Sequence, residues 1–192
     1  CGRISPEKSL DVVIDSFALV QKKRRRAKLV IIGDGPSKVD LEKQAEELGI
    51  KDSVIFLGHV SHERLIDENL LLLADTFVTA SKTENQPMSI LEAMSFGLPI
   101  VGANSKGIPE LIENGENGLL FEPDNPQDMA TCMLHMANKR RKRRRMGHGA
   151  LKFAAEYQMP QVVDRLEEVY EQAIEQSKYS RKKVASKKIQ SR

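Results

Sequence analysis

Two glutamates eight residues apart mark the stretch of this 192-residue chain whose residue types and spacing best suit chemistry. Glu84 and Glu92 flank Pro87, which suits the first position of a helix because its φ is preset and it has no N–H to leave unpaired. The first amides of such a helix lack intrahelical partners and, with the positive end of the helix dipole, attract phosphate. The amides concerned are those of Met88, Ser89 and Ile90. The stretch therefore predicts a phosphate-binding site with a carboxylate on either side. Such a site would suit a sugar joined to a nucleotide through a diphosphate.

Apolar runs alternate with helical periodicities on both sides of this stretch. The runs predict strands at 28–33, 53–57, 76–79, 99–102 and 119–121. Helices are predicted from an N-cap at Ser5, at 38–48, 62–74, 87–95 and 108–113, and then at 126–137, 143–156 and 160–177. This alternation is typical of an α/β domain with a Rossmann-like, doubly wound parallel sheet and helices on both faces. Ligands of such sheets bind at the carboxyl ends of the strands, the edge that carries the Glu84 loop.

Length, charge and cysteine content limit the class of protein. We predict one domain at residues 1–177 and a basic, disordered tail at 178–192. The tail holds seven basic residues and no acidic one, so the remainder carries a net charge of −4 although the whole chain carries +3. Cys1 and Cys132 are too few for a disulfide framework or a metal site, which fits a reducing, cytoplasmic compartment. No apolar run approaches the roughly 18 residues that a membrane span needs.

Five motifs, taken together, resemble those of the C-terminal, donor-binding half of family 4 retaining glycosyltransferases, whose two-domain architecture is called GT-B. The first motif, at residues 84–112, combines the Glu-x7-Glu spacing at 84–92 with Gly-Leu-Pro-Ile-Val at 97–101 and Gly-Ile-Pro-Glu-Leu-Ile at 107–112. The other motifs are Gly-Arg-Ile-Ser-Pro-Glu-Lys at 2–8, Gly-Asp-Gly-Pro at 33–36, Val-Ile-Phe-Leu-Gly at 54–58 and Asn-Gly-Glu-Asn-Gly-Leu-Leu-Phe at 114–121. The resemblance covers about residues 2–175 and implies the fold of a GT-B donor domain.

The resemblance also implies roles for individual residues. Arg3 and Lys8 match the cations that clamp the donor diphosphate, whose negative charge grows as the glycosidic bond breaks. Glu92 matches the residue that accepts hydrogen bonds from the ribose hydroxyls. Glu84 matches the catalytic position beside the donor sugar, where it acts either as a nucleophile or as electrostatic support for positive charge on the sugar. Gly33 matches the glycine turn near the nucleotide.

The base, the metal and the donor sugar are less closely defined. Phe56 and Leu57 stand where members of the family hold the nucleobase, although a buried strand explains the same residues equally well. No Asp-x-Asp occurs in the sequence, so we predict a metal-independent site that takes a UDP-, GDP- or ADP-sugar. The family's Gly-Phe-Gly after the first glutamate is replaced by residues 85–87, Asn-Gln-Pro, which leaves the donor sugar open. Gly33 and Gly35 lack the third glycine of a dinucleotide fingerprint, which argues against an NAD site.

The resemblance implies a hexosyltransferase that retains the anomeric configuration of its donor. Its acceptor would be bound by an N-terminal domain that this chain lacks, and we expect the fragment alone to be inactive. Because the chain opens on Cys1 rather than Met, we also expect it to be part of a longer protein. Three alternatives stay open: a sugar-nucleotide epimerase, a non-catalytic nucleotide-sugar-binding module, and a basic nucleic-acid-binding protein, which the absence of aromatic interleaving disfavours.

Seven cations in a row occupy residues 139–145. The run fits a solvated junction between two helices. It also fits an anionic membrane surface, which attracts each basic side chain by roughly 1 kcal/mol. Peripheral association with the cytoplasmic face of a membrane is therefore an expectation, and nucleic acid is not an expected partner.

Overall fold

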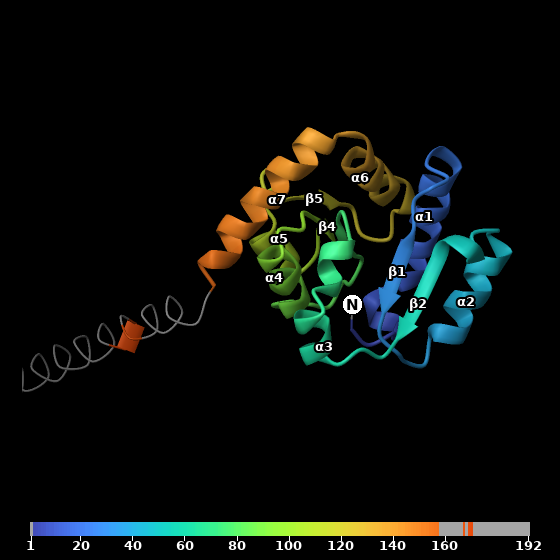
Figure 1. Cartoon of the computed structure of the whole chain (residues 1–192), viewed down its shortest axis with the longest axis horizontal. Coiled ribbons are helices and arrows are strands. Elements are labelled where there is room, and N and C mark those ends of the chain that lie inside the picture. The colour runs from blue at the N-terminus through green and yellow to red at the C-terminus, as the bar shows by residue number, and fades with distance from the viewer. Residues whose placement is uncertain (1, 158–166, 168, 171–192) are drawn as a thin grey trace, which may run out of the picture. The chain divides into compact units, whose positions relative to one another are not determined.

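A computed structural model of the protein describes residues 2–157, 167, 169 and 170, and a compact unit ends at Ala154 (Figure 1). Within the described residues the strands form two parallel sheets. One holds β1 (Leu29–Ile32) and β2 (Val54–Gly58). The other holds β3 (Phe77–Thr79), β4 (Ile100–Ala103) and β5 (Gly118–Phe121), in that order. The predicted parallel α/β class is confirmed, and each strand begins and ends within one residue of its predicted bounds.

The strands do not form one continuous ladder in the described part of the chain. β1 pairs only with β2, and β3 pairs only with β4, so each of these two strands keeps one edge without a neighbouring strand. The first described residues run past the carboxyl end of β1, where the Gly2 amide donates to the Ile32 carbonyl at 2.9 Å and the Ile4 amide to the Asp34 carbonyl at 2.9 Å. This segment carries Arg3 and Lys8 to the carboxyl edge of the strands.

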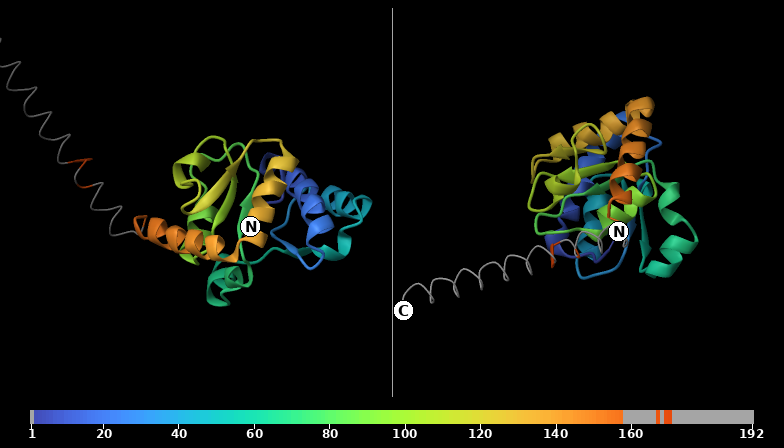
Figure 2. Two further views of the ribbon diagram at one scale, coloured as in Figure 1. Left: turned by 90° about the horizontal axis from the view of Figure 1, so that it is seen from above. Right: turned by 90° about the vertical axis from the view of Figure 1, so that its left-hand side faces the viewer.

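Helices cover both faces of the β3–β5 sheet. On β4, Val101 and Ala103 belong to the large apolar core that includes α1 (Leu10–Lys23) and α6 (Pro126–Asn138). α1 and α6 lie side by side (Figures 1 and 2). Gly102 faces the opposite way, toward α5 (Ile108–Leu111), because a Cβ there would lie 2.8 Å from the Ile108 side chain. α4 (Met88–Ser95), whose Ile90 and Met94 are fully buried, packs on β4 as well.

Ser5 is the N-cap residue of a helical turn, as predicted, but its side chain makes no capping hydrogen bond and the turn does not continue into the long helix. Residues Pro6–Lys8 form a single 3₁₀ turn, and α1 begins only at Leu10, because Ser9 takes a left-handed conformation (φ 47°) between the two. The Ser5 hydroxyl instead donates to the Glu7 carboxylate at 2.6 Å. The turn is what projects Lys8 away from the long helix that follows it.

Other helices also differ from their predicted bounds, and α5 ends two residues early, at Leu111. The segment predicted at 62–74 divides into α3 (His62–Asp67) and the 3₁₀ helix η3 (Leu70–Leu73), because Asn69 adopts φ 52° between them. α2 (Lys38–Glu47) is close to its prediction, and another 3₁₀ turn, η2 (Lys51–Ser53), precedes β2. α7 (Arg140–Ala155) begins three residues earlier than predicted, so most of the basic run is helical rather than a junction.

Of the helix predicted at 160–177, only residues 167, 169 and 170 are described, and these three are helical. The rest of that helix, the basic tail at 178–192 and the predicted domain boundary between them lie outside the described residues. None of the helices described is both long and apolar enough to cross a membrane.

Candidate functional site

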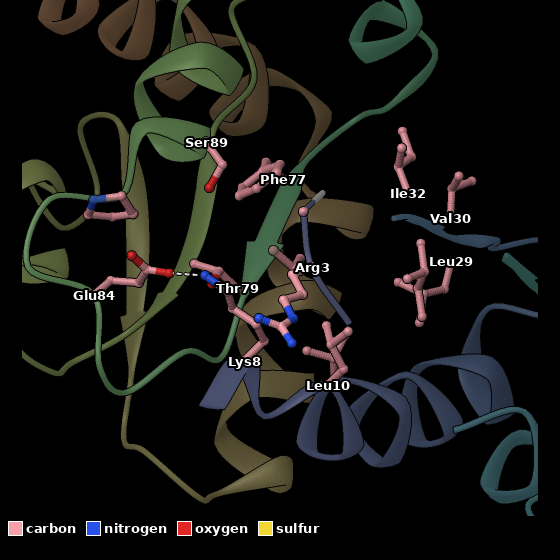
Figure 3. A pocket seen from close by; sticks show the side chains of 15 residues that line it. Arg3, Lys8, Leu10, Leu29, Val30, Ile32, Phe77, Thr79, Glu84 and Ser89 are labelled. Carbon is pink, nitrogen blue, oxygen red and sulfur yellow. Dashed lines mark hydrogen bonds and ion pairs between the residues drawn. The ribbon is translucent and has the colours of Figure 1, made fainter. Parts of the chain in front are cut away.

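A small pocket opens where the N-terminal segment meets the loop after β3. Its polar lining includes Thr79 and four residues that the sequence analysis placed at one site, Arg3, Lys8, Glu84 and Ser89 (Figure 3). These four come from three segments: residues 2–8, the loop between β3 and α4, and the first turn of α4. The parallel strands direct these segments to one edge, as expected for a ligand site of an open parallel sheet. Two cations thus lie beside one carboxylate, a balance that favours an anionic ligand.

Lys8 and Glu84 are joined by an ion pair across this pocket, drawn as a dashed line in Figure 3. The Lys8 ammonium donates to the Glu84 carboxylate, and the two side chains keep 34% and 23% of their exposure. Such a partly exposed pair is worth only about 0–1 kcal/mol, because water competes for both charges. An incoming phosphate can therefore take the ammonium away from Glu84 at little cost.

The loop that carries Glu84 is fixed by contacts that sequence reasoning missed. The Gly107 amide donates to the Glu84 carbonyl at 3.0 Å, and the Ser105 hydroxyl donates to the Lys82 carbonyl at 3.2 Å. A Cβ at position 107 would stand 1.6 Å from the Asn85 carbonyl oxygen, so only glycine allows this approach. The conspicuous Gly-Ile-Pro sequence at 107–109 was a signal for this packing role. These contacts hold the backbone of the loop in place, and therefore also the point from which the Glu84 side chain extends.

A further contact ties this loop region to the N-terminal segment. The Ser81 hydroxyl, which is fully buried, donates to the Glu7 carbonyl at 3.2 Å. The Glu7 side chain stays in solvent, where the Ser5 hydrogen bond, a backbone hydrogen bond and the charges of Arg3 and Lys8 lower its pKa. Glu7 is thus an anion at neutral pH beside the two cations, and it moderates the positive charge of the pocket rim.

The start of α4 differs in detail from the predicted phosphate-binding site. Pro87 is the N-cap residue, with an extended backbone (ψ 101°), and Met88 is the first helical residue. The Ile90 amide donates to the Pro87 carbonyl at 3.0 Å, so the prediction that this amide is free is wrong. The Ile90 amide is instead used in a 3₁₀-type hydrogen bond within the first turn of the helix. The amides of Met88 and Ser89 remain at the open end of the helix, and Ser89 also lines the pocket.

Glu92 does not line this pocket. It lies one turn further along α4, and its carboxylate is 3.7 Å from the Nδ1 atom of His62 on α3. His62 was not predicted as a site residue, because it precedes Glu92 by thirty positions and no motif links residues so far apart. Both side chains are reachable from solvent, with exposures of 67% for His62 and 28% for Glu92.

The remaining predicted residues lie around the pocket rather than in it. Gly33 packs against the backbone of Gly2, because a Cβ there would lie 1.7 Å from the Gly2 carbonyl oxygen. This close approach gives Gly33 a structural role whether or not it contacts a nucleotide. Phe56 packs against the apolar core, whereas Leu57 is half exposed and lines a different, larger hollow. The structure does not bring either residue to the cation pair.

Fold and site together define a class of protein: a parallel α/β domain that presents paired cations, a carboxylate and a helix start at the carboxyl ends of its strands. Residues 1–153 match the family described as Glycosyl transferases group 1, and the chain belongs to this family. The inferred glycosyltransferase resemblance and GT-B-type fold are confirmed.

Individual relatives agree with the family assignment. The chain is 32% identical over 170 residues to an alpha-D-kanosaminyltransferase of Streptomyces kanamyceticus, covering 88% of this chain but 44% of the relative. The crystal structure of Anabaena HepE in complex with UDP matches with a TM-score of 0.79 and 25% identity, over 89% of this chain and 48% of that one. The catalytic domain of a cholesterol-alpha-glucosyltransferase from Helicobacter pylori matches with a TM-score of 0.73 and 30% identity, over 82% and 95%. The chain therefore spans less than half of the full-length kanosaminyltransferase.

Proposed function

We propose that this chain is the donor-binding half of a retaining hexosyltransferase that uses a nucleotide-diphosphate sugar. The observation that carries the proposal is the convergence of Arg3, Lys8 and Glu84 on one pocket beside the start of α4. Family membership supports the transferase class, and the UDP held by one solved relative supports a UDP-sugar ahead of GDP- and ADP-sugars.

The proposed roles follow from charge and position. Arg3 and Lys8 hold the diphosphate and stabilise the negative charge that develops as the bond from the anomeric carbon to the phosphate oxygen breaks. An acceptor hydroxyl attacks the same face of that carbon, and its proton passes to the departing phosphate oxygen, which gives retention. Glu84 orients the sugar hydroxyls and supports positive charge on the sugar.

Glu92 would accept hydrogen bonds from the ribose hydroxyls, and the amides of Met88 and Ser89 would meet a phosphate oxygen. Two protein cations at the diphosphate would make a metal ion unnecessary. Nucleotide binding is therefore expected to survive EDTA, and binding that is lost on chelation and restored by Mg²⁺ or Mn²⁺ would contradict metal independence.

A second, N-terminal domain would supply the acceptor site. Much of a transferase's rate comes from holding two reactants in aligned geometry, an effect worth roughly 7–11 kcal/mol. Residues 1–192 should therefore bind UDP in calorimetry yet transfer no sugar from UDP-glucose to any acceptor. Robust transfer by this chain alone would refute the assignment of the acceptor site to another domain, and absence of UDP, GDP and ADP binding would refute the donor site.

We further propose that the protein works at the cytoplasmic face of a membrane. Five further basic residues occupy positions 22–26, at the end of α1 and just after it. The Arg24 guanidinium donates to the Asn138 side chain, which lies directly before the basic run at 139–145. Two cations of the run are engaged elsewhere, Arg143 with Asp75 and Arg145 with Glu116. The others are exposed, as are residues 22–26. We propose that residues 22–26, 139–142 and 144 act together as one basic surface.

Vesicle sedimentation tests this surface. We expect binding to vesicles with phosphatidylserine, little binding to pure phosphatidylcholine, and loss of binding in Arg140→Glu/Arg141→Glu. The matched control is Lys43→Glu/Lys51→Glu, which reverses two exposed charges elsewhere. Equal loss in both double variants would leave net charge, not this surface, as the cause.

A further inference from the structure

A polar pair that the pocket does not include lies where α3 meets α4. The Nδ1 atom of His62 stands 3.7 Å from the Glu92 carboxylate. This separation exceeds the roughly 3.2 Å that a direct N–H···O hydrogen bond allows. Apart from this approach, the described residues offer the Glu92 carboxylate no hydrogen-bond donor, although its side chain keeps only 28% of its exposure. The carboxylate therefore has acceptor capacity that a ligand can use.

The position of Glu92 on α4 relates this pair to the pocket. Ser89 lines the pocket, and Glu92 follows it by three positions on the same helix. Residues three apart are neighbours on one helix face, and at 1.5 Å of rise per residue Glu92 lies about 4.5 Å further along the axis. A ribose is joined to its diphosphate through the 5′ carbon. With the diphosphate at the pocket, the 2′- and 3′-hydroxyls can therefore reach the next turn of the same helix.

The start of α3 brings His62 to Glu92. His62 is the first residue of α3 and follows the carboxyl end of β2 by four positions, so the connection between the two elements delivers it to the edge that carries the site. Ser61 is the N-cap residue, and its hydroxyl accepts from the Arg64 amide at 3.3 Å. Arg64 itself pairs with Glu68 on the same helix at 2.7 Å. The imidazole is thus the basic group of α3 that approaches Glu92.

The chemistry of the two groups determines what can bind between them. An ionised carboxylate only accepts hydrogen bonds, so a bridging group must donate to Glu92. An Nδ1 atom that carries a proton only donates, so the same group must accept from His62. A hydroxyl does both with one oxygen, and an oxygen about 2.8 Å from each atom fits between two atoms 3.7 Å apart. An ammonium cannot accept and an ionised phosphate cannot donate, so the pair selects a hydroxyl.

We propose that His62 is a specificity-determining residue of the donor site and that it binds one ribose hydroxyl of the nucleotide jointly with Glu92. This inference rests on the proposed function. The shared hydroxyl donates to the Glu92 carboxylate and accepts from the Nδ1–H of His62, and the vicinal hydroxyl donates to the second carboxylate oxygen. A nucleotide without the shared hydroxyl leaves both protein groups without that partner. The site therefore favours ribonucleotides over the corresponding deoxyribonucleotides.

Titration calorimetry with UDP, 2′-deoxy-UDP and 3′-deoxy-UDP tests this assignment. His62→Ala should weaken UDP binding about two- to tenfold, the loss expected for one neutral hydrogen bond. The same substitution should have no effect on the deoxynucleotide that lacks the shared hydroxyl, and its full effect on the other one. His62→Asn keeps a donor nitrogen at the position of Nδ1 and should recover most of the UDP affinity. The control is His148→Ala, which removes an exposed imidazole on α7 and should change none of the three affinities.

An equal loss of affinity for all three ligands in His62→Ala would overturn the proposal, since His62 would then only support the structure around α4. Unchanged UDP affinity in His62→Ala would overturn it too, because the pair would then be a surface contact in water. Either result leaves UDP binding by the unsubstituted chain intact. Absence of that binding would instead refute the donor site, and the role of His62 with it, so the two failures are distinguishable.

Discussion

The ion pair between Lys8 and Glu84 makes a quantitative prediction about nucleotide binding. A donor diphosphate must compete with Glu84 for the Lys8 ammonium. A hydrogen bond from lysine to phosphate contributes about 1.5–3 kcal/mol, and the partly exposed pair that it replaces is worth about 0–1 kcal/mol. The difference, about 0.5–3 kcal/mol, means that Lys8→Met should weaken UDP binding roughly 2- to 150-fold.

The opposite substitution in the same pair should act in the other direction. Glu84→Gln removes the competitor while keeping the size of the side chain, so UDP should bind with unchanged affinity or up to about fivefold more tightly. In a protein that also carries the proposed acceptor domain, Glu84→Gln should reduce turnover, because we assign Glu84 to the donor sugar rather than to the nucleotide.

Titration calorimetry with UDP measures both variants and the double variant. The control is Lys43→Met, which breaks an exposed pair with Glu47 on α2, far along the chain from the pocket. Thermal midpoints show whether each variant is folded. UDP affinity that is unchanged in Lys8→Met would refute the clamp. A Glu84→Gln variant that loses as much affinity as Lys8→Met would show that Glu84 contacts the nucleotide itself.

Three further predictions concern single residues. Glu92→Gln should raise the dissociation constant of UDP several-fold, since a ribose contact is worth about 1 kcal/mol; calorimetry that shows no change would remove Glu92 from the nucleotide site. Gly107→Ala places a Cβ against the Asn85 carbonyl and should lower the thermal midpoint by roughly 2–12 °C and weaken UDP binding. A thermal midpoint equal to that of the unsubstituted chain would show that the loop carrying Glu84 can move to make room. Burial and the charge of Asp128 raise the pKa of the Cys132 thiol to about 11. In a Cys1→Ser background the rate of Cys132 alkylation should therefore be slow at pH 7.5 and should rise about tenfold per pH unit until the pH reaches this pKa. An alkylation rate that levels off near pH 9 would contradict this pKa.

Local sequence patterns were enough to predict most helices and strands and the edge of the sheet at which the site lies. Apolar runs identify strands such as β4, whose four residues are all buried, because a strand buried on both faces must be apolar along its length. The spacing of Glu84 and Glu92 around Pro87 identified the start of α4, because proline restricts the local backbone. These signals are local, so a linear chain contains them in full.

Which side chains come into contact depends on tertiary packing and could not be predicted from local patterns. The pairing of Lys8 with Glu84 spans 76 positions and depends on two loops that end at the same edge. The support from Gly107 and the approach of His62 to Glu92 are equally non-local. The use of the Ile90 amide in a tight first turn depended on backbone angles that Pro87 does not set for its neighbours. Ladder pairing likewise needs an adjacent strand, and for this reason the break between β1 and β3 was not visible in sequence patterns that describe each strand alone.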